Sequence, residues 1–303
     1  MAHEYNRFPL ELIPEIVAHP EDYRVLSRVP YTEYADGSHF PLVFRETPEP
    51  AQSFVFLEMT TAGTRRHDSI LELVLIKCYF LPDSGEIVSI DRMVHSYEAP
   101  RYQIPSYISK ATGITNESIS GQSFDYREIE SLMRDDPIIV STRGVRAREF
   151  FERRFSSLRG FRWVNSVYDV RWEKIDARLS AGSPLQISCE RLGFFYRNNR
   201  IVETALVNLW LFSYLKGAVS ELIKASSRVE YLVWAYTARF EVKEELKFSG
   251  YQWNRERKCW YKHVYTDEEV RAETDYLREK CSTPDAVKVE VLDSRKGDSQ
   301  KTI

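Results

Sequence analysis

A carboxylate follows a strongly apolar stretch of this sequence and is the first candidate for chemistry. Residues 53–63 read SFVFLEMTTAG, in which residues 54–57 are continuously apolar and Glu58 comes next. Such a run predicts a strand buried on both faces. Ligands of open sheets usually bind where strands leave the core, and a glutamate oxygen can bind a hard divalent cation. Glu58 is therefore a candidate metal ligand.

Arginines are the second group that could do chemistry, because a guanidinium fork binds phosphate directly. Three of them fall at the start of an expected helix, where the helix N-terminus adds partial positive charge. The candidate phosphate-binding residues are Arg143, Arg146, Arg148, Arg65, Arg66 and Arg200. The three helical arginines also have Glu149 and Glu152 as neighbours, with which they could form an ordinary solvated face of ion pairs. The sequence leaves both interpretations open.

The elements that must position these residues alternate between strands and helices. Residues 70–80 and 86–97 are β-rich and flank a Pro-Asp-Ser-Gly turn, so together with residues 54–57 they predict a three-stranded antiparallel meander. The later pattern predicts strands at 138–140 and 163–167 and helices at 126–133, about 145–155, 185–192 and 201–215. The expected fold class is α/β.

Two segments carry a resemblance to a known family. Glu58 is followed by Thr60, Thr61 and Gly63, and residues 104–115 combine Ile-Pro with Ala-Thr-Gly-Ile-Thr. With the order of strands and helices, they make residues 53–216 resemble the DnaQ-like (DEDDh) 3′-to-5′ exonucleases of the ribonuclease H-like superfamily. The resemblance implies a mixed central sheet flanked by helices. It also implies hydrolysis of nucleic acid by two divalent cations, magnesium or manganese, held by four acids, with a histidine as general base.

The sequence departs from this family at all five chemical positions. The resemblance places the first two acids at Glu58 and Thr60, the third at Ala147, the base at Asn199 and the fourth at Thr204. Glu58 alone keeps a carboxylate, and one carboxylate carries too little charge to hold two cations. We therefore expect neither catalytic residues nor a cofactor, with magnesium or manganese relevant only if activity is retained.

Composition divides the chain into four parts. We expect an N-terminal extension at residues 1–50 packed on the core, an exonuclease-fold domain at 51–217, a small α+β module at 228–281 and a disordered polar tail at 282–303. The small module resembles one found in bacterial relatives of the same family, with Gly-Tyr-x-Trp and Trp-Tyr as its landmarks.

The aromatic residues of the small module allow two interpretations. The module interleaves aromatic with basic side chains: Trp253, Trp260, Tyr251, Tyr261, Arg255, Arg257, Lys258 and Lys262. Such side chains can form a platform on which the bases of single-stranded nucleic acid stack. A unit of about 50 residues also needs large aromatics merely to build a core. Alternation along each strand favours the core interpretation.

Bulk composition narrows the class of protein. The 303 residues are 43% hydrophobic and 29% charged, and the net charge of −3 gives no global basic field for nucleic acid. The four cysteines lack metal-ligand spacing, and no apolar stretch has the length of a membrane span. We expect a cytoplasmic protein of bacterial type that makes no membrane contact.

Three functions are compatible with these patterns. The first is a pseudoenzyme that has lost two-metal phosphodiester hydrolysis and binds nucleic acid or a nucleotide without cleaving it. The second is a pseudoenzyme that acts as a protein-interaction or regulatory subunit, with another protein or as a homodimer. The third is an active metal-dependent 3′-to-5′ exonuclease with a rebuilt site, for which Glu149 and Glu203 are the nearby acids. We favour the first, so we expect that the chain is not an enzyme.

Overall fold

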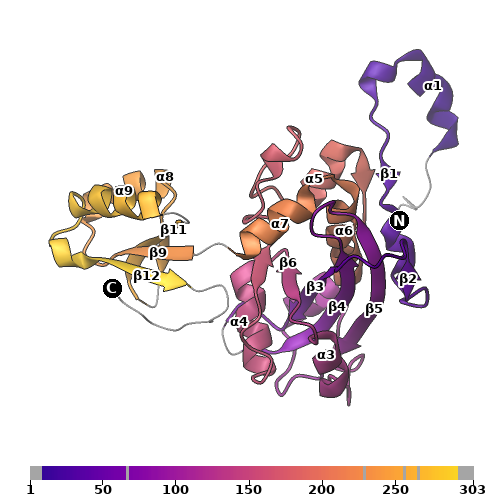
Figure 1. Cartoon of the computed structure of the whole chain (residues 1–303), viewed down its shortest axis with the longest axis horizontal. Coiled ribbons are helices and arrows are strands. Elements are labelled where there is room, and N and C mark those ends of the chain that lie inside the picture. The colour runs from indigo at the N-terminus through magenta and orange to yellow at the C-terminus, as the bar shows by residue number, and fades with distance from the viewer. Residues whose placement is uncertain (1–8, 66–67, 228–229, 255–256, 265–266, 293–303) are drawn as a thin grey trace.

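The computed structural model describes residues 9–65, 68–227, 230–254, 257–264 and 267–292 of the chain. A six-stranded sheet with helices on both faces is followed along the chain by a smaller four-stranded sheet (Figure 1). The large sheet has the order β2-β5-β4-β3-β6-β7, with strands Leu42–Val43 (β2), Gln52–Thr61 (β3), Ile70–Phe80 (β4), Ile87–Tyr97 (β5), Ile138–Ser141 (β6) and Trp163–Asn165 (β7). The predicted α/β class, a mixed central sheet flanked by helices plus a small α+β module, is confirmed.

The strand β3 is the centre of the large sheet. It pairs with β4 in antiparallel orientation, and β4 pairs with β5 in the same way, which confirms the predicted meander. On its other side β3 pairs in parallel with β6, and β6 pairs in parallel with β7. Residues 53–60 of β3 are all buried. The carboxylate of Glu58 therefore belongs to a strand that is buried over most of its length.

Successive side chains of β3 point alternately into two hydrophobic cores. Phe54 and Phe56 face one core, to which α5, α6 and α7 contribute, whereas Val55 and Leu57 face a second core with α3 and α4. Because side chains alternate along a strand, Glu58 faces the α6 side, as Phe56 does. The α-helices of this part are Ser106–Thr112 (α2), Tyr126–Leu132 (α3), Gly144–Arg154 (α4), Leu185–Leu192 (α5), Ile201–Tyr214 (α6) and Ala218–Ser226 (α7). The packing of α7 on the first core extends this domain beyond residue 217.

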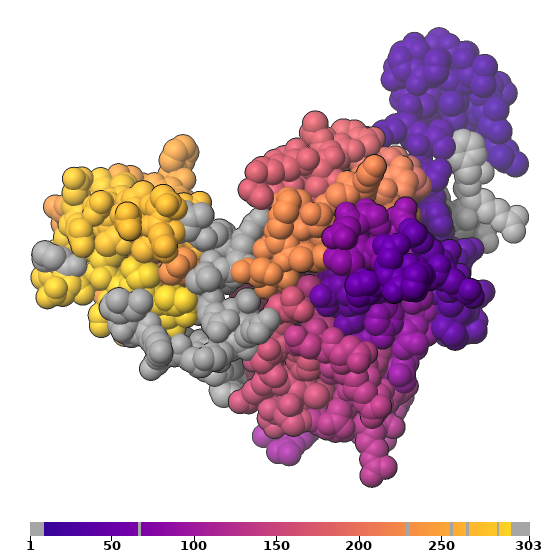
Figure 2. All heavy atoms as spheres, in the orientation of Figure 1, coloured from indigo at the N-terminus to yellow at the C-terminus, as the bar shows by residue number. Residues whose placement is uncertain are grey.

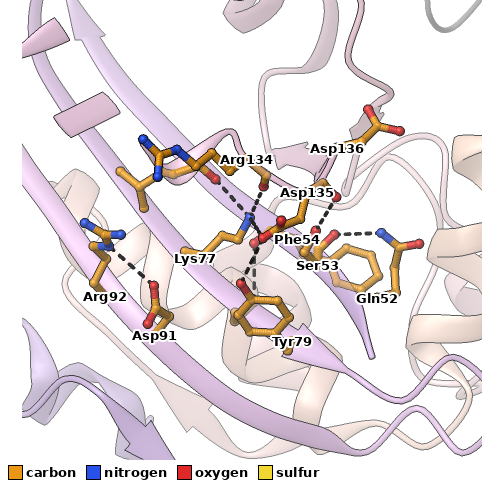
Figure 3. Close-up of polar contacts among 12 residues, drawn as sticks. Gln52, Ser53, Phe54, Lys77, Tyr79, Asp91, Arg92, Arg134, Asp135 and Asp136 are labelled. Carbon is orange, nitrogen blue, oxygen red and sulfur yellow. Dashed lines mark hydrogen bonds and ion pairs between the residues drawn. The ribbon is translucent and has the colours of Figure 1, made fainter. Parts of the chain in front are cut away.

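A buried lysine ties β4 to the turn that precedes β6 (Figure 3). Lys77 is 2% exposed, and its ammonium donates hydrogen bonds of 2.9 Å to the carbonyl of Leu132 and 2.7 Å to that of Arg134. Asp135, which has a φ of +71°, lies 4.0 Å from the same ammonium. The Ser53 hydroxyl donates to the carbonyl of Asp135. These bonds hold the end of α3 and the start of β6 against β3 and β4.

The N-terminal segment divides into an attached and an exposed part. The strand β1 (Ser27–Arg28) pairs in parallel with β8 (Phe194–Phe195), and β2 pairs with β5, so this part packs on the large domain as expected. The helix α1 (Ile13–Ala18) has no buried residue and projects from the molecule at the end of an indigo arm (Figures 1 and 2).

The small module has the element order β-α-β-β-α-β. Its elements are β9 (Glu230–Ala235), α8 (Lys243–Phe248), β10 (Gln252–Asn254), β11 (Cys259–Val264), α9 (Asp267–Arg278) and β12 (Val287–Leu292). They build an antiparallel sheet of order β10-β11-β9-β12.

The expectation of a disordered tail from residue 282 is wrong for β12. This strand pairs with β9 over its whole length. Val287 and Val289 alternate with Lys288 and Glu290, a strand pattern that the polar composition of the segment concealed. Residues 293–303 lie outside the described part of the chain.

The helices that the structure describes include none with both the length and the apolar character needed to cross a lipid bilayer.

Candidate functional site

A cleft of about 330 Å³ opens beside the end of β3, against the start of α6. Five segments meet there: β3, the β6-to-α4 junction, the loop after β7, the start of α5 and the segment that leads into α6. The lining residues are Glu58, Thr142, Arg143, Val167, Tyr168, Gly182, Pro184, Leu185, Gln186, Tyr196, Asn198, Ile201 and Thr204. The fold therefore brings Glu58 together with polar and aromatic groups from four later segments.

Glu58 is the acidic residue of the cleft. It is only 2% exposed, and its Oε1 accepts a hydrogen bond of 2.7 Å from the backbone N–H of Thr142. Burial raises the pKa of this carboxyl to about 6, against the opposing effects of the bonds with Thr142 and the charge of Arg143. Glu58 is therefore charged at neutral pH and loses its charge under mildly acidic conditions.

Arg143 is held beside Glu58 by the turn that starts α4. It is the residue before the helix, and its backbone N–H donates to the hydroxyl of Ser141. The next residue, Gly144, has a φ of +46°, and a Cβ there would lie 2.5 Å from the amide nitrogen of Asn165. Only glycine fits this turn, so Gly144 sets the position of the arginine at the cleft.

Another wall of the cleft is lined by aromatic and amide side chains. Burial raises the pKa of Tyr196 well above its usual range, so this phenol stays protonated. Gln186 accepts a hydrogen bond from Asn198, and both line the cleft. Tyr168 is 65% exposed at the rim. Such a wall offers rings for stacking and amides for polar contacts, with no further carboxylate.

The family's other chemical positions fall in different places. Thr204 lines the cleft together with Glu58, whereas Thr60, Ala147 and Asn199 do not. Ala147 is buried in the second core, and Asn199 is exposed outside the cleft, which its neighbour Asn198 lines instead.

The candidate phosphate-binding arginines also differ in whether they line the cleft. Arg143 lines the cleft, and Arg146, within the helix that Arg143 precedes, is exposed but does not line it. Arg148 forms an ion pair of 2.8 Å with Glu152, the helix-face arrangement that the sequence left open. Arg65 and Arg200 are exposed and also lie outside the cleft lining. Arg66 lies outside the described residues.

A second polar cluster, Thr60 with Glu72, His95 and Tyr97, lies on the three antiparallel strands. Glu72 accepts hydrogen bonds of 2.8 Å from Thr60, 3.1 Å from Tyr97 and pairs with His95 at 2.9 Å. Burial alone would raise the pKa of Glu72, but the bonds from His95 and Thr60 outweigh it and lower that pKa. Thr60, at which the resemblance places the family's second acid, is thus bonded to a carboxylate on the neighbouring strand.

The cleft does not fit the two cations of the family. Two-metal sites need several anionic oxygens around the ions, and the cleft lining contains one carboxylate with an arginine beside it. Within the described ranges, the one group of three or more acidic, histidine or cysteine side chains whose ligand atoms lie within 4.8 Å of one another is His19, Glu21 and Asp22. These are exposed in the N-terminal segment and are not part of the cleft.

In the small module, the structure assigns the predicted aromatic residues to different roles. Trp260 and Tyr251 are buried in the core under the helices, as the core interpretation expected. Trp253 is 49% exposed on the edge strand β10, and it packs edge-on against Trp260. Tyr261 faces the opposite side of the sheet, with Trp234. Arg255 lies outside the described residues.

Several lining residues carried no sequence signal. Tyr168, Gly182 and Gln186 come from the loop after β7 and the start of α5, where we recognised no motif. Tyr196 lies just before residues 198–204, where the resemblance places the family's third motif. This nearness to the motif was the one sequence signal that could have marked Tyr196 as a lining residue.

No protein-family model matches this chain, and no curated protein matches it significantly. Among solved structures, E. coli exonuclease I in complex with a dA16 oligonucleotide aligns with 60% of this chain and 48% of its own, at 15% identity and a TM-score of 0.43. The chain thus spans about half the length of that exonuclease.

Two further structures are of 3′-exonucleases. One, described by its 3′-end-specific recognition of a histone mRNA stem-loop, aligns with 57% of this chain and 83% of its own, at 12% identity and a TM-score of 0.39. The other, a full-length 3′-exonuclease, aligns with 58% and 84%, at 14% identity and a TM-score of 0.41. At these identities the similarity is one of fold alone.

Proposed function

We propose that the cleft binds nucleic acid or a nucleotide through its phosphate, without two-metal hydrolysis. The observation that carries this proposal is that one buried carboxylate, Glu58, and the exposed arginine Arg143 line the same cleft, where the family would gather acids. A guanidinium binds a phosphate oxygen pair directly and supplies positive charge without a metal. Arg143 also precedes α4, whose N-terminal N–H groups favour an anion.

The size and walls of the cleft support the same ligand class. Small-molecule sites usually occupy about 300 to 1,000 Å³, and the cleft of about 330 Å³ lies at the lower end of that range. Tyr168 and Tyr196 offer ring surfaces to a base, and Gln186 and Asn198 offer amide groups to its polar edge. A single nucleotide, free or at the end of a strand, matches this combination.

The test compares Arg143, which precedes α4, with Arg146 inside α4. Labelled single-stranded and duplex DNA and RNA are titrated with the purified chain at low and high salt, and cleavage is recorded with and without manganese. Arg143→Ala should weaken binding about tenfold, the value of one charge-assisted hydrogen bond. It should also lower the slope of log affinity against log salt by about 1. Arg146→Ala is the matched control because Arg146 does not line the cleft.

Each other result has a definite meaning. Equal losses from Arg143→Ala and Arg146→Ala would contradict the cleft as the binding site and point to a diffuse basic helix face. Absence of binding to every probe would contradict the proposal and favour a protein-interaction subunit.

One observation favours a second candidate, phosphodiester cleavage by a rebuilt site. Glu72 lies 2.8 Å from the hydroxyl of Thr60, so a carboxylate is present next to the position where the family's second acid is missing. Manganese-dependent cleavage that disappears in both Glu58→Gln and Glu72→Gln would establish this candidate in place of the first.

A further inference from the structure

The small module leaves one face of its sheet without a helix of its own. The helices α8 and α9 pack on the side of Val233, Trp260 and Val264. Residues opposite each other in an antiparallel pair share a face. Trp234, which pairs with Tyr261 and with Lys288, therefore lies on the other, helix-free face.

Four rings form a continuous row on this helix-free face. The ring centroids of Tyr236 and Trp234 are 6.2 Å apart, those of Trp234 and Tyr261 5.2 Å, and those of Tyr261 and His263 5.5 Å. Tyr236 is 37% exposed, and Tyr261 and His263 are half-buried, whereas Trp234 is 4% exposed. We call these four residues the aromatic row. Trp234 is almost fully covered, and the other three keep part of their surface accessible.

Cations lie directly over the aromatic row. The guanidinium of Arg257 is 4.3 Å from the ring centre of Trp234, and the ammonium of Lys288 is 5.6 Å from that of Tyr236. Glu290 on the same face accepts a hydrogen bond from the indole N–H of Trp234 and forms an ion pair of 2.9 Å with Arg257. The charge of Arg257 is therefore balanced by Glu290, and Lys288 adds a further positive charge beside Tyr236, while the acid Glu149 lies near enough to Tyr261 to interact with it electrostatically.

We infer that the helix-free face binds single-stranded nucleic acid, with bases stacked on the aromatic row and phosphates on Lys288 and Arg257. Base stacking on aromatic side chains beside a basic surface is the usual mode of single-strand binding. The β-α-β-β-α-β order with a four-stranded antiparallel sheet also occurs in modules that stack bases on the sheet face. Positive charge attracts the phosphates of a single strand, and the rings can stack on its unpaired bases. This site is separate from the cleft and requires none of its residues.

The test uses the full chain carrying Arg143→Ala, which removes the phosphate contact of the cleft. Labelled oligothymidylate and oligouridylate of about twelve nucleotides, and a duplex of equal length, are titrated by fluorescence anisotropy. Tyr236→Ala should weaken single-strand binding at least about fivefold, the lower range for one stacking ring, whereas Tyr236→Phe should preserve it. Lys288→Ala should weaken binding and reduce its salt dependence.

The matched control is Phe248→Ala, which removes a ring that is 96% exposed on α8, away from the helix-free face. Its affinity should equal that of the parent, and thermal unfolding of each variant confirms that it is folded. Equal affinity of Tyr236→Ala and the parent, an equal loss in Phe248→Ala, or duplex binding as tight as single-strand binding would overturn the inference. The two oligonucleotides show whether DNA or RNA is preferred.

Discussion

At the residue scale, two opposing effects act on the pKa of Glu58. Its burial favours the neutral acid, whereas the backbone N–H of Thr142 and the charge of Arg143 favour the carboxylate, and the balance leaves its pKa at about 6. The charge of Arg143 acts on this carboxyl, so under the proposed function an ionised Glu58 would compete with a phosphate for the same guanidinium.

The titration of Glu58 predicts a pH-dependent change in stability. The pKa of about 6 in the folded chain lies above the ordinary value of 4.5. The folded state therefore holds this proton more tightly than the unfolded state does, and the resulting stability is fully present below pH 4.5 and lost as the pH rises through 6. Glu58→Gln cannot ionise. It should be more stable than the parent at neutral pH, by up to about 2 kcal/mol.

Urea unfolding of the parent and of Glu58→Gln at neutral pH and near pH 4.5 measures this difference. The advantage of the variant should disappear at the lower pH. Glu130→Gln, which changes an exposed glutamate of α3, serves as the control. A difference between parent and Glu58→Gln that stays constant with pH would contradict the raised pKa.

At the scale of elements, the site depends on how β6 and α4 are placed beside β3. The parallel pairing of β3 with β6 brings Thr142 and Arg143 to Glu58. The position of β6 depends in turn on Lys77, whose ammonium binds the carbonyls that end α3. A buried side chain on β4 thus contributes to the geometry of a cleft that it does not line.

Replacement of Lys77 by methionine should destabilise the domain. The change preserves most of the apolar stem but leaves the carbonyls of Leu132 and Arg134 without the ammonium donor. Loss of charged hydrogen bonds of this kind costs about 3 kcal/mol. Lys110→Met, at an exposed position of α2, is the matched control and should change the free energy of unfolding by less than about 0.5 kcal/mol. Equal effects of the two substitutions in urea unfolding would show that Lys77 is not a structural anchor.

At the scale of the whole molecule, two sheets with separate cores carry the two proposed sites. The cleft belongs to the large sheet and the aromatic row to the small one. The small sheet requires β12, which pairs with β9 and whose Lys288 and Glu290 contact the aromatic row.

Removal of β12 should unfold the small module and spare the large domain. A chain ending after residue 286 leaves β9 with an unpaired edge, whereas a chain ending after residue 292 retains β12. Limited proteolysis should cut the shorter chain between residues 230 and 281 at least about tenfold faster than the longer one, because cleavage follows the population of the open state. Equal protection of the two chains would show that the module folds without β12.

Much of the fold could be predicted from the sequence because local patterns are strong in the large domain. The helix at Leu185–Leu192 and the meander β3-β4-β5 lie where the apolar periodicity placed them. The sequence did not indicate α7, and β12 escaped prediction because its short alternating run lies in a polar segment. Its strand conformation depends on pairing with β9, more than fifty residues earlier in the chain.

The sequence by itself predicted the type of most elements of the large domain and marked Glu58 as a candidate for chemistry, although β3 runs on to Thr61 and does not end before Glu58 as expected. Only the tertiary structure decided which side chains share the cleft. Glu58 and Thr60 lie on the same face of one strand, yet Glu58 turns to the N–H of Thr142 and lines the cleft, whereas Thr60 binds Glu72 and does not. Hydrogen-bond partners and burial come from strands and loops that are distant in sequence, so a local pattern specifies a residue's face but not its neighbours.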